Sequence, residues 1–236
     1  MRVALLSLVA AAACPASHAD NGRPAAPPYD HDAMVRFHMR ERYDLLGAVQ
    51  HFAIRGDLYD VQVIGRAIGA SLDEPGLDRW SRDVGFARAN ARELALAPST
   101  EEACRRIARL AATCASCHVD AKVTGIFGAP PGPPADGGAI DARMARHAWA
   151  ADRLFEGVIG GSDESWLAGL DVLAQTPAPW STAEPNQAVF ARGLQDLATR
   201  ARKRGAQADF AARASVYGDV LVACSGCHAA SHPHAP

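Results

Sequence analysis

The amino-acid sequence predicts an all-α protein built as two tandem four-helix bundles, each with its helices in up-down-up-down order. Alanine and arginine dominate the 236 residues, and the runs of Val, Ile and Thr that are typical of strands are absent. Apolar residues recur along most of the chain with the spacing of amphipathic helices, and short connections join one such stretch to the next. The whole pattern occurs twice, on either side of a segment rich in Pro and Gly.

The first predicted bundle spans residues 30–122 and contains four helices. Its first helix carries apolar residues near one face, with Arg42 as the exception. Before the fourth helix, Ser99 and Glu102 form a predicted capping box, in which the serine oxygen accepts a backbone hydrogen bond and the glutamate carboxylate turns back toward the cap. The three earlier helices end at breaking residues, which are Gly56-Asp57, Pro75-Gly76 and Pro98.

Residues 123–138 form a predicted linker, because a segment with Ala-Pro-Pro-Gly-Pro-Pro and Gly-Gly supports neither helix nor strand. The second predicted bundle spans residues 139–230, and a tail of residues 231–236 follows it. Its helices are delimited by breaking and capping residues, which are Gly160-Gly161, Pro177–Pro179, a second capping box at Ser181–Glu184, and Gly205.

One five-residue pattern, C-x-x-C-H, closes the last helix of each bundle. It occurs as Cys114-Ala115-Ser116-Cys117-His118 and as Cys224-Ser225-Gly226-Cys227-His228. The last cysteines of the two copies are 227 − 117 = 110 residues apart, and His38 and His147 in the first helices are 147 − 38 = 109 residues apart. Two thiols three positions apart on a helical turn can each add to one vinyl group of a porphyrin, and the adjacent His then lies under the iron. The sequence therefore predicts two covalently bound haem c groups.

Two other kinds of site also use paired cysteines. A thioredoxin-like C-x-x-C opens a helix, where the helix dipole lowers a thiol pKa, but both motifs here close helical patterns. Four thiolates could bind zinc, but that site would leave the His after each pair unexplained. Cys104, outside both motifs, is predicted to be a small buried thiol.

Residues 1–19 have the features of a signal peptide, with a positively charged start, an apolar stretch at Val3–Ala13 and a small-x-small cleavage site at Ser17-His18-Ala19. Residues 20–29 form a predicted flexible leader. A rival interpretation makes Cys14 the lipidated first residue of a membrane-anchored lipoprotein. Both interpretations export the chain to the periplasm, and export is what the assembly of c-type haem requires in bacteria.

A four-helix unit that carries C-x-x-C-H at the end of its last helix resembles the class II c-type cytochromes, the cytochrome c prime family. Gly56-Asp57 at the end of the first helix is a further similarity. The resemblance covers each half of the mature chain and implies a tandem, dihaem member. It implies thioether bonds at Cys114, Cys117, Cys224 and Cys227, and proximal iron ligands at His118 and His228.

In this family, a residue near the start of the first helix faces the other side of the haem, either as an apolar residue or as a ligating Met. The equivalent positions here are His38 or Met39, and His147. Because His38 and His147 recur at the same register, we predict that each fills the sixth coordination site of its iron. Met34, Met39 and Met144 are the alternative ligands, and an open site is the third possibility.

These features predict an electron carrier that passes single electrons between redox partner proteins by transient contact, and no enzymatic activity. The alternatives are a haem protein that senses NO or CO at a five-coordinate iron and a small haem peroxidase. The net charge of −2 gives no indication of nucleic-acid binding. No apolar run of eighteen residues follows the N-terminal segment, so no transmembrane helix is expected in the mature protein.

Overall fold

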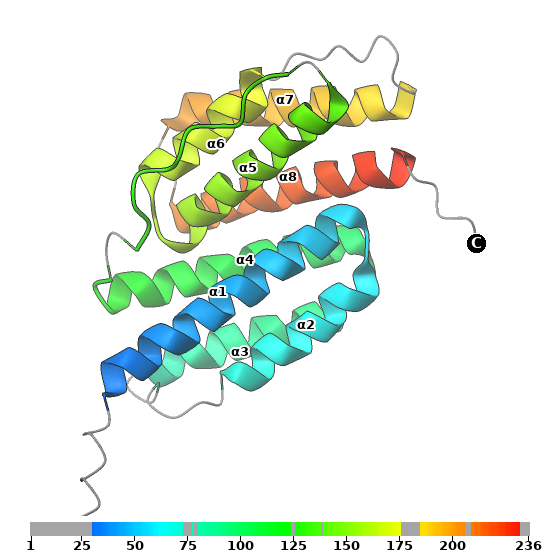
Figure 1. Ribbon diagram of the computed structural model, residues 1–236. Coiled ribbons are helices and arrows are strands. Elements are labelled where there is room, and N and C mark those ends of the chain that lie inside the picture. The colour runs from blue at the N-terminus through cyan, green and yellow to red at the C-terminus, as the bar shows by residue number, and fades with distance from the viewer. Residues whose placement is uncertain are drawn as a thin grey trace, which may run out of the picture. The chain divides into compact units, whose positions relative to one another are not determined.

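Eight α-helices and no strand occur in the part of the chain that the structure, a computed structural model, describes (Figure 1). That part comprises residues 30–72, 77, 80–123, 126–137, 139–175, 185–205 and 209–231. The predicted all-α class is confirmed. The helices are α1 (His31–Arg55), α2 (Leu58–Ser71), α3 (Ser81–Ala95), α4 (Thr100–Asp120), α5 (Ile140–Ile159), α6 (Asp163–Gln175), α7 (Pro185–Arg204) and α8 (Phe210–Ser231).

The helices pack in two sets that repeat one pattern of contacts. Helix α1 packs on α2, α2 on α3 and α3 on α4, and α1 also contacts α4. In the same way α5 packs on α6, α6 on α7 and α7 on α8, and α5 also contacts α8. Successive helices are therefore neighbours in space, as short connections require.

The two sets meet along α4 and α8, with α2 and α3 on one side and α6 and α7 on the other (Figure 1). Helix α1 also contacts α8, and its counterpart α5 contacts α4, so the interface is reciprocal in the manner of a two-fold dimer. A Cβ added to Gly218 of α8 would lie 3.2 Å from the Cβ of Ala108 of α4, so small residues permit the close approach. The chain from His31 onward forms one compact unit.

Arg42, the charged exception on the apolar face of α1, is buried in the structure, with only 6% of its surface exposed. Its Nε donates a hydrogen bond to the Ser71 hydroxyl at 3.3 Å, and a second guanidinium N–H donates to the Ser71 carbonyl. Ser71 is the last residue of α2, where carbonyls lack partners within the helix. The arginine is therefore tolerated on this face because it satisfies the end of the neighbouring helix.

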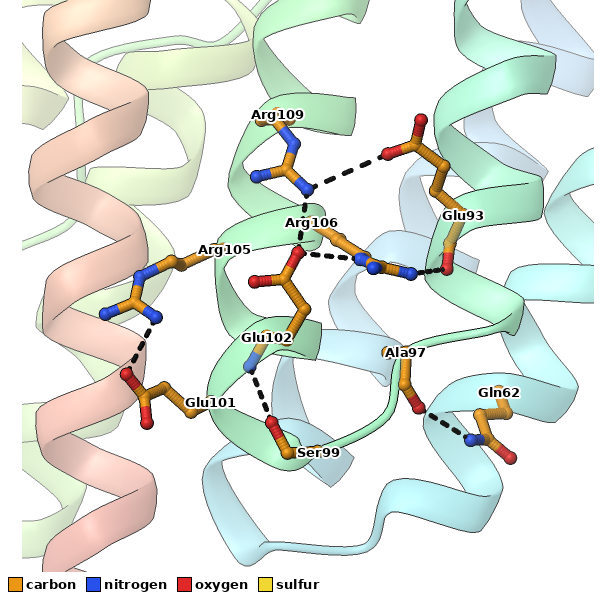
Figure 2. Close-up of polar contacts among 9 residues, drawn as sticks. All are labelled: Gln62, Glu93, Ala97, Ser99, Glu101, Glu102, Arg105, Arg106 and Arg109. Atoms are coloured by element: carbon orange, nitrogen blue, oxygen red, sulfur yellow. Dashed lines mark hydrogen bonds and ion pairs between the residues drawn. The ribbon is translucent and has the colours of Figure 1, made fainter.

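The N-terminus of α4 confirms one half of the capping box predicted there (Figure 2). The backbone N–H of Glu102 donates to the Ser99 hydroxyl at 3.2 Å. The Glu102 carboxylate does not return to the cap but accepts hydrogen bonds from Arg106 at 2.8 Å and Arg109 at 3.1 Å. These arginines lie on the same helix face and hold the pKa of Glu102 below its usual value. The second predicted capping box, Ser181–Glu184, lies outside the described residues.

Three of the predicted helix ends have a glycine in the left-handed region of backbone conformation, one of them Gly161 after α5, with φ of 64°. Gly56 has φ of 85° just after α1, and Gly205 has φ of 69° just after α7. Residues with a Cβ rarely adopt this conformation for steric reasons, so glycine at these positions predicts the end of the helix.

The predicted linker contributes to packing as well as to connection. Residues 126–137 contain neither helix nor strand. Arg146 of α5 donates a hydrogen bond to the Pro134 carbonyl at 2.7 Å, and the ring of Phe127 lies 5.4 Å from that of Tyr43, centroid to centroid.

A membrane-crossing helix is absent from the described ranges, since no helix there combines sufficient length with sufficient apolar character. The predicted signal peptide, the leader at residues 20–29, the lipidation site at Cys14 and tail residues 232–236 lie outside those ranges.

Replacing Gly157 with alanine should destabilise the contact between α5 and α6. The added Cβ would lie 2.6 Å from the Cβ and 2.8 Å from the Cα of Trp166, so backbone must move. We expect unfolding to require about 1–3 kcal/mol less free energy, the usual cost of overpacking, measured by chemical denaturation. Gly193→Ala in α7 is the matched control, because no atom lies within 4 Å of its added Cβ. That control should gain about 0.5–1 kcal/mol from helix propensity, and equal stability of the two variants would contradict the packing.

Candidate functional site

The two C-x-x-C-H motifs lie in the last turns of α4 and α8, where the sequence predicted them. On a helix, residues three positions apart share a face, so both cysteines of each motif project to the same side. Each motif lines a cavity of its own. We call the one that contains Cys114 the first cavity and the one that contains Cys224 the second cavity.

The first cavity has a volume of about 590 Å³, and its wall includes Cys114, Cys117 and His118. The remainder of the wall is largely apolar, with side chains such as Leu46, Leu72, Leu77, Trp80, Val84 and Ala87. Its polar residues include three arginines of α1, Arg36, Arg40 and Arg42, and the acidic Asp44 and Asp83. A volume of several hundred cubic ångströms with apolar walls and a few polar groups is typical of a cofactor pocket.

The second cavity is larger, at about 840 Å³, and contains Cys224, Cys227 and His228. Phe190 of α7 packs directly against the motif, since a Cβ added to Gly226 would lie 2.3 Å from its ring. The glycine in this copy of the motif therefore makes room for an aromatic wall. The basic groups Arg55 and Arg153 also line the second cavity.

The His118 ring is held in one orientation by a backbone carbonyl. Its Nδ1 lies 2.9 Å from the carbonyl oxygen of Ile159, and because a carbonyl only accepts, Nδ1 must carry the proton. This bond leaves Nε2 as the nitrogen that can ligate a metal, and metal-bound histidines usually have such a partner on the other nitrogen. Ile159 is the last residue of α5, so the partner comes from the other set of helices.

The motif thiols are in an environment that keeps them protonated. Desolvation raises the pKa of Cys114 and of Cys224 to about 12 each, and that of Cys117 to about 11. Thiols that act in disulfide exchange need the opposite shift and lie at helix N-termini, so this geometry does not fit a thioredoxin-like site.

A four-thiolate zinc site does not fit the geometry either. The two cysteine pairs line different cavities, and among the described residues no three His, Cys, Asp or Glu side chains are grouped so that they could hold a metal ion. Cys104 lies in neither wall; it is fully buried in the core, and burial raises its pKa to about 12.

His147 lies in the wall of the second cavity together with Met144 and His228. Desolvation lowers the pKa of His147, and the charges of Arg146 and His228 act in the same direction. Burial therefore favours the neutral ring, which is the form that ligates metals. Of the two histidines predicted as sixth ligands, His147 is the one that the structure brings into a cavity with its motif.

The first cavity differs from this pattern. Met39 lies in its wall, whereas His38 is not among the lining residues, and the Nδ1 of His38 lies 3.1 Å from the carboxylate of Glu41. Met34 is 38% exposed and is likewise absent from the lining. Neighbouring residues on a helix point about 100° apart, so His38 and Met39 face different directions. Equal register in the repeat therefore did not ensure that His38 lines the first cavity as His147 lines the second.

Several lining residues carry no signal in the sequence. Tyr43 and Asp44 line both cavities, and Phe127 of the predicted linker lines the first. Arg42, which also lines the first cavity, does have a sequence signal, because a charge on an otherwise apolar helix face needs a buried partner or a ligand.

No known protein-family model, curated protein or solved structure matches the chain.

Proposed function

We propose that this chain is an exported dihaem c-type cytochrome that carries single electrons between redox partner proteins. The observation that supports it is that each C-x-x-C-H motif lines a separate cavity of cofactor size with both thiols and the imidazole in the wall. We further propose that the two sets of helices are tandem four-helix bundles of the class II cytochrome type. The repeated contact pattern and the motif at the end of the last helix of each set favour this assignment.

The residues present suit haem c. The cysteines of each motif would form the thioether bonds, and His118 and His228 would be the proximal ligands. The His118–Ile159 hydrogen bond fixes the imidazole tautomer that ligation needs. Arginines in both walls, Arg36 and Arg40 in the first and Arg55 in the second, offer charge partners for the haem propionates.

When bound, each haem supplies a one-electron ferric–ferrous couple. The protein's part is to hold the group rigidly, to exclude water with apolar side chains, and to fill or leave open the sixth iron site. His147 is our proposed sixth ligand in the second cavity. For the first cavity His38 remains the prediction from the repeat, and Met39, which lies in the wall, is its rival.

The mass and colour of the mature chain test this function. Expressed with a c-type haem maturation system, the chain should carry two porphyrins by intact mass and show the absorption bands of haem c. A colourless chain, or a mass without porphyrin, would contradict the proposal.

Carbon monoxide separates the carrier from a gas sensor. An iron with both axial sites filled by protein side chains should not bind carbon monoxide, so we expect the spectrum of the reduced protein to stay unchanged when the gas is added. A shift of the haem bands would instead support the sensor, which needs an open iron, and would revise the assignment of the sixth ligands.

A further inference from the structure

The two cavities are each completed by the opposite set of helices. The second cavity takes part of its wall from α1, through residues such as Gly47, Gln50 and Ile54. The first cavity includes Ile159 of α5, whose carbonyl also accepts the His118 hydrogen bond. Each candidate site therefore includes residues from both sets of helices.

Tyr43 of α1, with its neighbour Asp44, is part of both walls at once. The two cavities therefore share part of their walls at this point. The repeat does not account for the sharing. In the register that aligns His38 with His147, Tyr43 corresponds to residue 43 + 109 = 152, which is Asp152, and Asp152 lines only the second cavity.

The Tyr43 ring contacts two other aromatic rings, one from each cavity. Its centroid lies 5.4 Å from that of Phe127, which lines the first cavity, with 45° between the ring planes. The ring of Phe155, which lines the second cavity, is stacked on Tyr43 at 5.4 Å with 25° between the planes. Phe155 is only 1% exposed, so the stack is anchored in the core. Close-packed aromatic rings of this kind cannot move independently, and they transmit a displacement from one side to the other.

We propose that Tyr43 is a positioning residue for both haem sites and couples them, so that a change at one site alters the other. The inference rests on the proposed function, since it requires a haem in each cavity. Coupling between two sites is reciprocal, so the redox state of either haem should affect the other. The chain would then work as a linked pair of sites and not as two independent carriers.

The proposal is tested by comparing variants of residues that line one cavity with variants of Tyr43, which lines both. The measurement is proton NMR of the ferric holoprotein, in which the paramagnetic iron shifts the haem methyl resonances away from those of the protein. Val84→Ala and Leu194→Ala assign the resonances, because Val84 lines only the first cavity and Leu194 only the second. Each should displace chiefly the methyl resonances of the haem whose cavity it lines, with a smaller displacement of the other set through the coupling. Tyr43→Leu should displace both sets, and Tyr43→Phe, which keeps the ring, should leave both near their wild-type positions. Displacement of one set alone by Tyr43→Leu would overturn the proposal.

A second measurement needs no variant. During stepwise reduction of the wild-type protein, the resonances of the haem that is still ferric should move as the other haem becomes ferrous. Resonances that stay fixed would overturn the coupling, even if Tyr43→Leu failed to fold. A chain that carries no haem would instead refute the proposed function, so the two failures are distinguishable.

Discussion

Replacing Cys114 and Cys117 together with alanine is expected to leave the chain with one covalently bound haem in place of two. Both thiols lie in the wall of the first cavity, and the second motif lies in a different cavity, so loss at one site should spare the other. The Cys224→Ala, Cys227→Ala pair should give the same loss at the second site. Intact mass spectrometry counts the porphyrins directly, and the absorbance per chain should fall by half in each pair.

The matched control for this experiment is Cys104→Ala. Cys104 is as difficult to ionise as Cys114, with a pKa that burial raises to about 12, but it lines neither cavity. The control should therefore keep both haems, although removal of a fully buried thiol will lower stability somewhat. Two haems in a motif double variant, or loss of a haem from the control, would contradict the assignment of the motifs.

Haem loss should also lower stability, since a group that binds only the folded chain stabilises it. The variant that loses the first haem retains a hollow of about 590 Å³ bounded by side chains such as Leu46 and Val84. We therefore expect thermal unfolding of each motif double variant to begin at a lower temperature than that of the Cys104 control. Equal unfolding temperatures would mean that the cavities are not the haem sites.

The local parts of this architecture could be predicted from sequence because their causes are local. Gly56 and Gly205 end helices through a backbone conformation that few other residues adopt, and Ser99 caps α4 with its own side chain. The C-x-x-C-H spacing is likewise a property of one helical turn. Such signals can be identified without knowing what the helix packs against.

Features that depend on the packing of distant helices were not predictable in this way. The Glu102 carboxylate is a separate, local case: Arg106 and Arg109 on its own helix compete with the cap for it, and a capping pattern does not include such competitors. Tyr43 gains its place between two cavities only when α1 packs against both α5 and the linker, as its contacts with Phe155 and Phe127 show. The partner of His118 is a backbone carbonyl in the opposite set of helices, and a carbonyl has no sequence signature.

The repeat predicted equivalent positions for His38 and His147, but only His147 lies in the wall of its cavity, and the reason is again the packing between helices. A duplicated sequence fixes the register of a residue along its helix, but the orientation of the side chain depends on how that helix is rotated against its neighbours. His147 lies in the second cavity and Met39 in the first, one position beyond the register of His38. The two sites therefore offer different candidate ligands, although their motifs are the same.

His147→Ala should convert the second haem from low spin to high spin and allow its ferrous form to bind carbon monoxide, while the first haem keeps its spin state. The reason is that His147 lies in the same cavity as His228, and its lowered pKa favours the neutral ring, which is able to ligate. Electron paramagnetic resonance of the ferric protein and carbon monoxide difference spectra of the reduced protein both report the change. His51→Ala is the control, because His51 lines the same cavity but has no counterpart in the repeat, and it should leave both irons low spin.

The same assay decides between His38 and Met39 at the first haem. The repeat predicts that His38→Ala opens the first iron, whereas the wall of the first cavity favours Met39→Ala. A Met ligand would also raise the reduction potential of the first haem above that of a bis-His second haem, because thioether sulfur favours ferrous iron. A spectroelectrochemical titration with two resolved steps, in which Met39→Ala lowers the upper one, would assign the ligand. Spectra unchanged in all three variants, His38→Ala, Met39→Ala and His147→Ala, would refute these three residues as ligands and leave Met34, Met144 or an open iron site as the remaining alternatives.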